Sequence, residues 1–435
     1  MAKPKGFRRR CTSGTAPEKS KWKIAGRRKL RAELNLLISA VEINDCHGVG
    51  IFLRRLFPDT SNFIAIRSSS LYGGENHFGS AGFELGKEIP GPEQRGARLR
   101  QILQGHKVDR ILAVPYYIED FENAYAAKSL TGAPLCVFLM DDQNIFERCV
   151  PDRTVFRLLR AADFRLAISQ EMGLAYQEKF GVSFHVLPPV MTKLPPDIAP
   201  RDFVSGARRA ALLGNIWRPE TLQLFRELIR NSDICVDWFG NGPKASWLRV
   251  NASDLEKDNI FCQGFLPDTA LLERLKRYPL MIVPSGSLGP DDPNVAFSRL
   301  SLPSRLIFAL VGAQIPALVL GSKETAAGRF VRNLGIGTVA GYDSEDFARA
   351  ILYLMDPENQ RLLRENGRTV ASRLVLEEGG EWIWRSLERR KPATLQFTEV
   401  FPLPSVHLNP LKVLQNLFAR ILSLNDKSKQ SATKT

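Results

Sequence analysis

The stretch FCQGFLPDTALLERLKRYPLMIVPSGSLGPDDPNVAFSRLSLPSRLIFALVGAQIPALVLGS, residues 261–322, alternates short apolar runs with helical segments. It predicts a strand ending at Gly264, a helix over 269–277, a strand over 279–283, a helix over 304–311 and a strand over 316–320. Strands separated by helices form parallel sheets, whose ligands bind at the carboxyl ends of the strands. The Ser/Gly/Pro-rich loop 284–303 is therefore the first candidate site.

The same alternation extends over most of the chain. Further strands are predicted at 34–41, 62–67, 108–115, 134–140, 162–169, 184–190, 209–213 and 234–239. Between the two halves, residues 191–207 contain three prolines and no apolar period, which is typical of an interdomain linker. We therefore predict an α/β protein with two Rossmann-like domains, residues 34–190 and 208–376, whose parallel sheets face a central cleft.

The net charge of +14 is concentrated at the two ends of the chain. Residues 1–33 carry six Lys and six Arg against two Glu, and residues 396–435 are also basic. Such tails are either solvated, disordered extensions or segments attracted to anionic lipid or nucleic acid. Nucleic acid is the weaker alternative, because only Phe7 and Trp22 are interleaved with the basic residues of the N-terminal segment.

The composition, 44% apolar and 24% charged over 435 residues, is that of an ordinary soluble protein. No apolar run is long enough to cross a bilayer, and the N-terminus lacks the apolar stretch of a secretory signal. We expect a cytoplasmic location. The six cysteines have no C-x-x-C spacing, and no Asp/His cluster indicates a metal site, so neither disulfides nor a bound metal are expected.

A glycine-containing loop, Glu42 to Gly50 (EINDCHGVG), follows the first predicted strand and leads into a helix. Gly48 and Gly50 would let backbone N–H groups approach an acceptor or a phosphate, although glycine also serves tight turns for steric reasons. His47 lies in the same loop and is a candidate catalytic residue.

Two carboxylates, Asp141 and Asp142, directly follow the buried run 134–140. Active sites of parallel sheets form at such strand ends. Capping of the N-terminus of a following helix by one of the two, with the other solvated, is an equal alternative. The sequence alone leaves both open.

Several blocks of the chain resemble, in order, those of GT-B-fold nucleotide-sugar glycosyltransferases of the retaining group that includes many bacterial polysaccharide transferases. The blocks are AISQEMGLAYQEKFGVSFHVLPPV, LLGNIWRPETLQLF, VDWFGNGP, IFCQGFLP, LMIVPSGS and LSLPSRLIFALVGAQIPALVLG. The resemblance spans about residues 34–390. It implies sugar transfer from a nucleotide-sugar donor to a glycan or lipid-linked acceptor, no further cofactor, and a helix over 377–390 that crosses back to the first domain.

The resemblance also implies roles for individual residues. Arg218 and Arg305 would face the donor diphosphate, Phe265 and Leu266 the base, and Ser285 and Gly286 the sugar. The full set of implied donor-binding positions is Gly214, Asn215, Arg218, Gly240, Phe265, Leu266, Ser285, Gly286, Pro303, Ser304 and Arg305. Asp141 or Asp142 would position the acceptor or stabilise positive charge on the sugar ring.

One departure from the family pattern concerns the donor ribose. Relatives carry a glutamate that binds the ribose at the position of Phe308, or of Ile307 if the alignment slips by one. No acid lies between Pro293 and Leu320. A non-catalytic GT-B-like glycan-binding or scaffolding protein is therefore the alternative hypothesis.

Residues 391–435 have no counterpart in the family. Within them, HLNPLKVLQNLFARILSL (407–424) places apolar side chains at helical spacing opposite a polar face. Binding to a membrane surface, together with the basic N-terminus, explains this pattern as well as packing onto the N-terminal domain or another subunit does. The first alternative predicts a peripheral location on the membrane.

Overall fold

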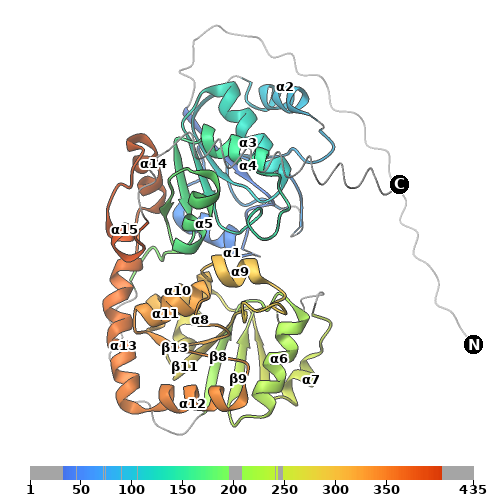
Figure 1. Cartoon of the computed structure of the whole chain (residues 1–435). Coiled ribbons are helices and arrows are strands. Elements are labelled where there is room, and N and C mark those ends of the chain that lie inside the picture. The colour runs from blue at the N-terminus through green and yellow to red at the C-terminus, as the bar shows by residue number, and fades with distance from the viewer. Residues whose placement is uncertain are drawn as a thin grey trace, which may run out of the picture.

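The computed structural model describes residues 33–403, except 46, 72, 74, 90, 105, 195–207, 241 and 243–247. The basic N-terminal segment, most of the predicted linker and the predicted amphipathic helix 407–424 lie outside the described residues. Figure 1 shows two α/β units stacked one above the other, with the N-terminal half above and residues 208–374 below.

The N-terminal half is built on a seven-stranded sheet in the order β3-β2-β1-β4-β5-β6-β7, with every pair parallel. Its elements are β1 Glu33–Ser39, α1 Gly48–Leu56, β2 Phe63–Arg67, β3 Ala81–Glu84, α2 Pro92–Ile102, β4 Lys107–Val114, α3 Ile118–Thr131, β5 Leu135–Leu139, α4 Asp152–Ala161, β6 Phe164–Ala167, α5 Gln170–Phe180 and β7 His185–Val186. The order reverses between β1 and β4, so the loops that follow these two strands border a crevice.

The C-terminal half has a six-stranded parallel sheet in the order β10-β9-β8-β11-β12-β13. Its elements are β8 Arg209–Leu213, α6 Pro219–Arg230, β9 Cys235–Phe239, α7 Ala252–Glu256, β10 Ile260–Gly264, α8 Asp268–Leu275, β11 Leu280–Pro284, α9 Val295–Leu300, α10 Ser304–Ala313, β12 Ala317–Leu320, α11 Ala326–Asn333, β13 Gly337–Ala340, α12 Ser344–Met355, α13 Pro357–Ala371 and the 3₁₀ turn η2 Ser372–Leu374. Here the crevice lies between β8 and β11.

Two terminal helices return to the first half of the molecule. After α13 runs along the side of the lower unit, α14 (Gly379–Arg389) and α15 (Gln396–Val400) lie against the upper one (Figure 1). Trp384 stacks on Phe63, and Trp382 packs edge-on against Phe164. The predicted crossing helix is therefore present, and its two tryptophans belong to the hydrophobic core.

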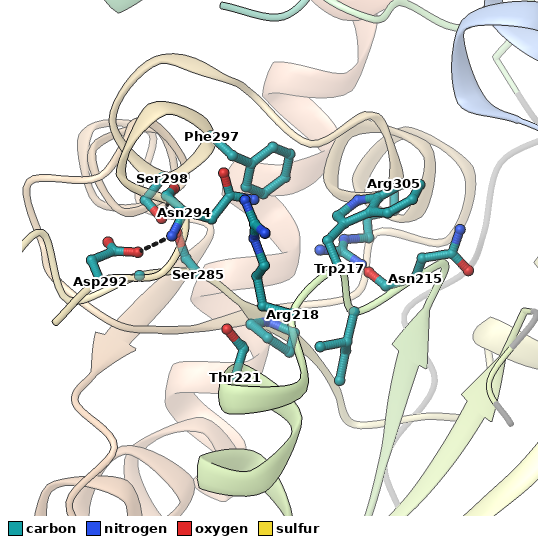
Figure 2. Close-up of a pocket in the computed structure, with 13 residues that line it drawn as sticks. Asn215, Trp217, Arg218, Thr221, Ser285, Asp292, Asn294, Phe297, Ser298 and Arg305 are labelled. Carbon is teal, nitrogen blue, oxygen red and sulfur yellow. Dashed lines mark hydrogen bonds between the residues drawn. The ribbon is translucent and has the colours of Figure 1, made fainter. Parts of the chain in front are cut away.

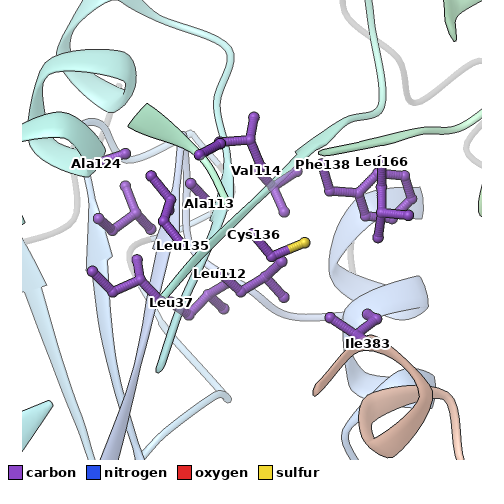
Figure 3. Close-up of a cluster of buried hydrophobic side chains, with 14 of the residues drawn as sticks. Leu37, Leu112, Ala113, Val114, Ala124, Leu135, Cys136, Phe138, Leu166 and Ile383 are labelled. Atoms are coloured by element: carbon purple, nitrogen blue, oxygen red, sulfur yellow. The ribbon is translucent and has the colours of Figure 1, made fainter. Parts of the chain in front are cut away.

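Strands buried on both faces form the centre of the upper core. Every residue of β5, LCVFL, is buried, as expected for a strand with helices on both sides. Figure 3 shows Cys136 and Phe138 of this strand among side chains of neighbouring strands and Ile383 of α14. The unit from Glu33 to Val186 is thus completed by a helix from the far end of the chain.

The predicted strands all correspond to observed ones, and β8 has the predicted bounds. The sequence did not indicate β3, α2, α4, α7, α9, α11, β13, α12, α13, η2 or α15. Of these, α9 matters most, because it lies inside the loop 284–303 that had been expected to be irregular. No helix in the described ranges combines the length and apolarity needed to span a bilayer.

Candidate functional site

A pocket opens at the carboxyl end of the second sheet, where the strand order reverses between β8 and β11. Figure 2 shows the residues that line it, which come from the loops after these two strands and from α6, α9 and α10. They are Asn215, Ile216, Trp217, Arg218, Thr221, Pro284, Ser285, Gly286, Asp292, Asn294, Phe297, Ser298 and Arg305. Five of the predicted donor-binding residues, Asn215, Arg218, Ser285, Gly286 and Arg305, are thereby brought together.

Arg305 is the charged group set deepest in this pocket. Its Nη1 donates to the carbonyl oxygens of Leu213 (2.9 Å) and Asn215 (2.7 Å), whereas its Nε is buried without a hydrogen-bond partner. Burial lowers the pKa of the guanidinium to about 10. Among the described residues no carboxylate pairs with it, so a half-buried cation faces the pocket without a counter-ion. Such a group is suited to bind an anion.

Two glycines, Gly214 and Gly240, allow the loops after β8 and β9 to approach each other closely beside Arg305. Gly214 (φ +75°) and Gly240 (φ +139°) have conformations that L side chains rarely adopt. A Cβ on Gly240 would lie only 3.0 Å from the Gly214 carbonyl oxygen, which already accepts a hydrogen bond from Trp238 Nε1 at 2.7 Å. At Gly214 a Cβ would make ordinary contacts with Arg305 at 3.6 Å, so only its positive φ favours glycine, whereas Gly240 is restricted by both its φ and its close neighbours.

The loop after β11 is held closed by Asp292. Its carboxylate accepts hydrogen bonds from the backbone N–H groups of Leu288 (3.0 Å) and Asn294 (2.9 Å). A Cβ on Gly286 would come within 1.9 Å of that carboxylate and 2.2 Å of Ser298 Oγ, so only glycine fits there. Ser285, which is buried, is fixed through its carbonyl oxygen by the hydroxyl of Tyr342 at 2.9 Å.

The outer edge of the pocket is more open. Arg218 is exposed at the N-terminus of α6 and forms no ion pair with any described residue. Beside it, Trp217 keeps 45% of its surface exposed. Phe265, 64% exposed, and Leu266 follow β10 and do not line the pocket. Their implied contact with a base stays a prediction.

The N-terminal half faces this site through the loop before α1. Gly48 lies opposite Ser304 of α10, whose Oγ would be 3.7 Å from a Cβ at that glycine. The ring of His47 caps α1: its Nδ1 accepts from the Gly50 N–H at 3.4 Å, and its Nε2 lies 2.8 Å from the Glu42 carbonyl oxygen. Burial lowers the pKa of His47. A neutral ring with both nitrogens engaged is a structural cap, and we assign it no part in catalysis.

The geometry separates the two aspartates that the sequence left equal. Asp142 is buried and accepts hydrogen bonds from four backbone N–H groups, those of residues 144–147, and from the hydroxyl of Tyr176 at 2.8 Å. It organises the loop after β5, so it has a structural role, although it caps a loop and not the helix that the alternative interpretation expected. Its carboxylate has little capacity left for a substrate.

Asp141 instead points into the space between the two halves. Its Oδ2 accepts from the hydroxyl of Tyr116 at 2.8 Å, and its Oδ1 accepts from Ser301 Oγ, on the other half, at 3.2 Å. The side chain keeps partial exposure. Burial raises the pKa of Asp141 to about 6, and the charge of Asp142 contributes slightly to this increase. The two hydrogen bonds act in the opposite direction, because they favour the ionised form. A carboxylate poised near neutral pH is suited to proton transfer.

This raised pKa predicts a pH dependence of stability. A carboxylate with a higher pKa in the folded state contributes stability below its unfolded pKa, and this contribution is lost as the pH rises through about 6. Asp141→Asn should therefore gain stability relative to wild type by about 1–2 kcal/mol between pH 4 and pH 7.5, allowing for partial exposure. Thermal unfolding of both proteins at the two pH values measures this difference. A stability difference between the two proteins that does not change with pH would contradict the raised pKa of Asp141.

Phe308, at the position where relatives carry a ribose-binding glutamate, is 6% exposed. The guanidinium of Arg55, from α1, lies 5.2 Å from its ring centroid and also pairs with Asp268 of α8. The described structure therefore offers no carboxylate at position 308, and the ring is covered from the opposite half.

The remaining pocket residues were not named individually from the sequence; they are Ile216, Trp217, Thr221, Pro284, Asp292, Asn294, Phe297 and Ser298. Trp217 could have been found from its place beside Arg218. Residues 292–298 lie within the loop 284–303 that the strand pattern had marked as the first candidate site, but nothing in the sequence singled out the individual residues. In the described part of the chain, no three His, Cys, Asp or Glu side chains are grouped as metal ligands.

No known protein family and no curated protein matches this sequence. The fold is similar to that of Anabaena Alr3699/HepE, solved in complex with UDP, with a TM-score of 0.55 and 12% identity over 82% of this chain and 100% of that chain. Two further solved structures cover 82% of this chain. One is UDP-N-acetylglucosamine 2-epimerase (TM-score 0.48, 13% identity, 96% of that chain), and the other is WaaG, a glycosyltransferase involved in lipopolysaccharide biosynthesis (0.49, 12%, 99%).

The predicted fold class is confirmed. Two parallel-sheet α/β units facing each other, with the similarity to Alr3699/HepE over its full length, constitute the GT-B fold. At 12% identity this similarity concerns the fold alone.

Proposed function

We propose that this protein is a glycosyltransferase that transfers a sugar from a nucleotide-sugar donor to a glycan or lipid-linked acceptor in cell-surface polysaccharide or glycoconjugate synthesis. The donor diphosphate would bind in the pocket between β8 and β11, and the acceptor would approach from the side of Asp141. By the family resemblance, transfer proceeds with retention of configuration.

The observation that carries this proposal is the unpaired guanidinium of Arg305. A half-buried cation without a counter-ion lowers the stability of a fold, so its position at a ligand-binding strand end favours a functional role. Arg218 adds a second unpaired cation to the same pocket. Two cations and a helix N-terminus suit a diphosphate, and a protein with these groups needs no metal to neutralise it. A similar fold binds UDP in Alr3699/HepE.

Phe308 is the observation that favours the alternative, a non-catalytic glycan-binding or scaffolding protein. A buried aromatic ring cannot accept hydrogen bonds from ribose hydroxyls as a carboxylate does. The ribose would then need another acceptor, or the donor site would be degenerate. Catalytic turnover separates the two functions, because a degenerate site can still bind a nucleotide.

Titration of the purified protein with UDP, GDP and ADP tests the donor site. We expect selective binding of one nucleotide by calorimetry, weakened about fivefold in Arg218→Ala, because an exposed charge pair contributes about 1 kcal/mol. The difference between wild type and variant should shrink as the salt concentration rises. Release of free nucleotide from the matching nucleotide-sugar then measures turnover. Absence of binding for all three nucleotides would overturn the proposed donor site.

A further inference from the structure

A short segment of the C-terminal half lines the pocket on one face and contacts the N-terminal half on the other. We call residues 294–301, which comprise α9 and the residues on either side of it, the latch segment. On one face, Asn294, Phe297 and Ser298 line the pocket. Figure 1 places α9 at the top of the lower unit, directly beneath the upper one.

The other face of the latch segment is anchored in the N-terminal half. Leu300 is 2% exposed and is part of the hydrophobic core of the upper unit. Its carbonyl oxygen accepts a hydrogen bond from Ser169 Oγ, the residue that also caps α5 through the Met172 N–H. Ser301 Oγ donates to Asp141. One turn of helix therefore connects the pocket wall to the core and to the candidate carboxylate of the opposite half.

We propose that Leu300 and Ser169, neither of which lines the pocket, are positioning residues for nucleotide binding. The pocket wall formed by Phe297 and Ser298 has its observed position because the adjacent Leu300 is held in the other half. A ligand that binds this wall binds the anchored state better than the detached one. Anchoring and nucleotide binding are then thermodynamically coupled, and each strengthens the other by the same factor. This inference rests on the proposed donor site.

The test compares wild type with Leu300→Ala and Ser169→Ala, and uses Arg299→Ala as the matched control. Arg299 is an exposed residue of the same helix and does not line the pocket. Calorimetry with UDP, GDP and ADP should show at least an about fivefold loss of affinity in Leu300→Ala and in Ser169→Ala, the lower end of typical coupling. Arg299→Ala should bind as wild type does. Ser169→Ala is informative because it alters only the N-terminal half.

Small-angle scattering gives a second, independent measurement. Leu300→Ala should have a larger radius of gyration than wild type, and a saturating nucleotide should reduce it toward the wild-type value. Unchanged affinity in two folded variants would overturn the coupling and leave the donor site intact. Failure of wild type to bind any of the three nucleotides would overturn both. If Leu300→Ala does not fold, the affinity of Ser169→Ala decides.

Discussion

Arg305→Met is expected to weaken nucleotide binding by about 100-fold while leaving the protein folded. Methionine keeps the apolar stem and removes the charge together with every donor. Loss of roughly 3 kcal/mol of charge-assisted hydrogen bonding corresponds to this factor. Calorimetry with the nucleotide that wild type prefers measures the effect.

In contrast to its large effect on binding, Arg305→Met is expected to change the stability of the fold little. Burial lowers the pKa of Arg305 to about 10, which means that the folded state disfavours its charged form at neutral pH. Removing the charge relieves this cost, while the hydrogen bonds to the Leu213 and Asn215 carbonyl oxygens are lost. We therefore expect a thermal midpoint close to that of wild type. A variant that binds poorly because it is unfolded would not support the assignment.

Arg364 provides a matched control. Its guanidinium is also buried, its pKa is also lowered to about 10, and it donates to the carbonyl oxygens of Tyr278 (3.0 Å) and Gln314 (3.2 Å). It does not line the pocket. By the argument given for Arg305, Arg364→Met should also keep a thermal midpoint close to that of wild type, and it should leave nucleotide affinity unchanged. Equal loss of affinity in both variants would mean that Arg305 acts through the fold and not through the ligand.

The strand pattern was predictable because apolar runs such as 209–213 are bounded by glycine loops, and parallel order follows from alternation with helices. By contrast, α2 (PEQRGARLRQI) has few apolar residues and α9 has six residues within a loop rich in Gly, Pro and Ser. Propensity and periodicity carry little information over such segments. Their helices depend on tertiary contacts, here the burial of Leu300 in the opposite core.

The candidate site was predictable in part for the same reason. Strand ends pointed to the loop 284–303, whereas Asn215, Ser285 and Arg305 were implied by the family resemblance, and all three line the pocket. Which of two adjacent aspartates faces the cleft depends on partners such as Tyr176 and Ser301, which lie far away in sequence. No local signal contains that information.

Asp142→Asn is expected to lose stability, whereas Asp141→Asn is expected to lose turnover. Asp142 accepts bonds from four backbone N–H groups and one hydroxyl, and an amide has a single acceptor oxygen. Leaving several buried donors unsatisfied should lower the free energy of unfolding by about 3 kcal/mol or more. Thermal or denaturant unfolding of the variant measures this loss.

Asp141→Asn should instead retain the fold and nucleotide affinity and lose turnover by about 10²–10⁴-fold, the range for loss of a positioned acid or base. Nucleotide release from the matching nucleotide-sugar measures the rate. Asn keeps the size of the side chain and one acceptor for Tyr116 or Ser301, so a loss of rate reflects the missing charge. If Asp142→Asn lost turnover while remaining stable and Asp141→Asn did not, the two assignments would have to be exchanged. Turnover unchanged in both would favour a chemistry that uses no carboxylate from this half, with the donor phosphate itself as the base.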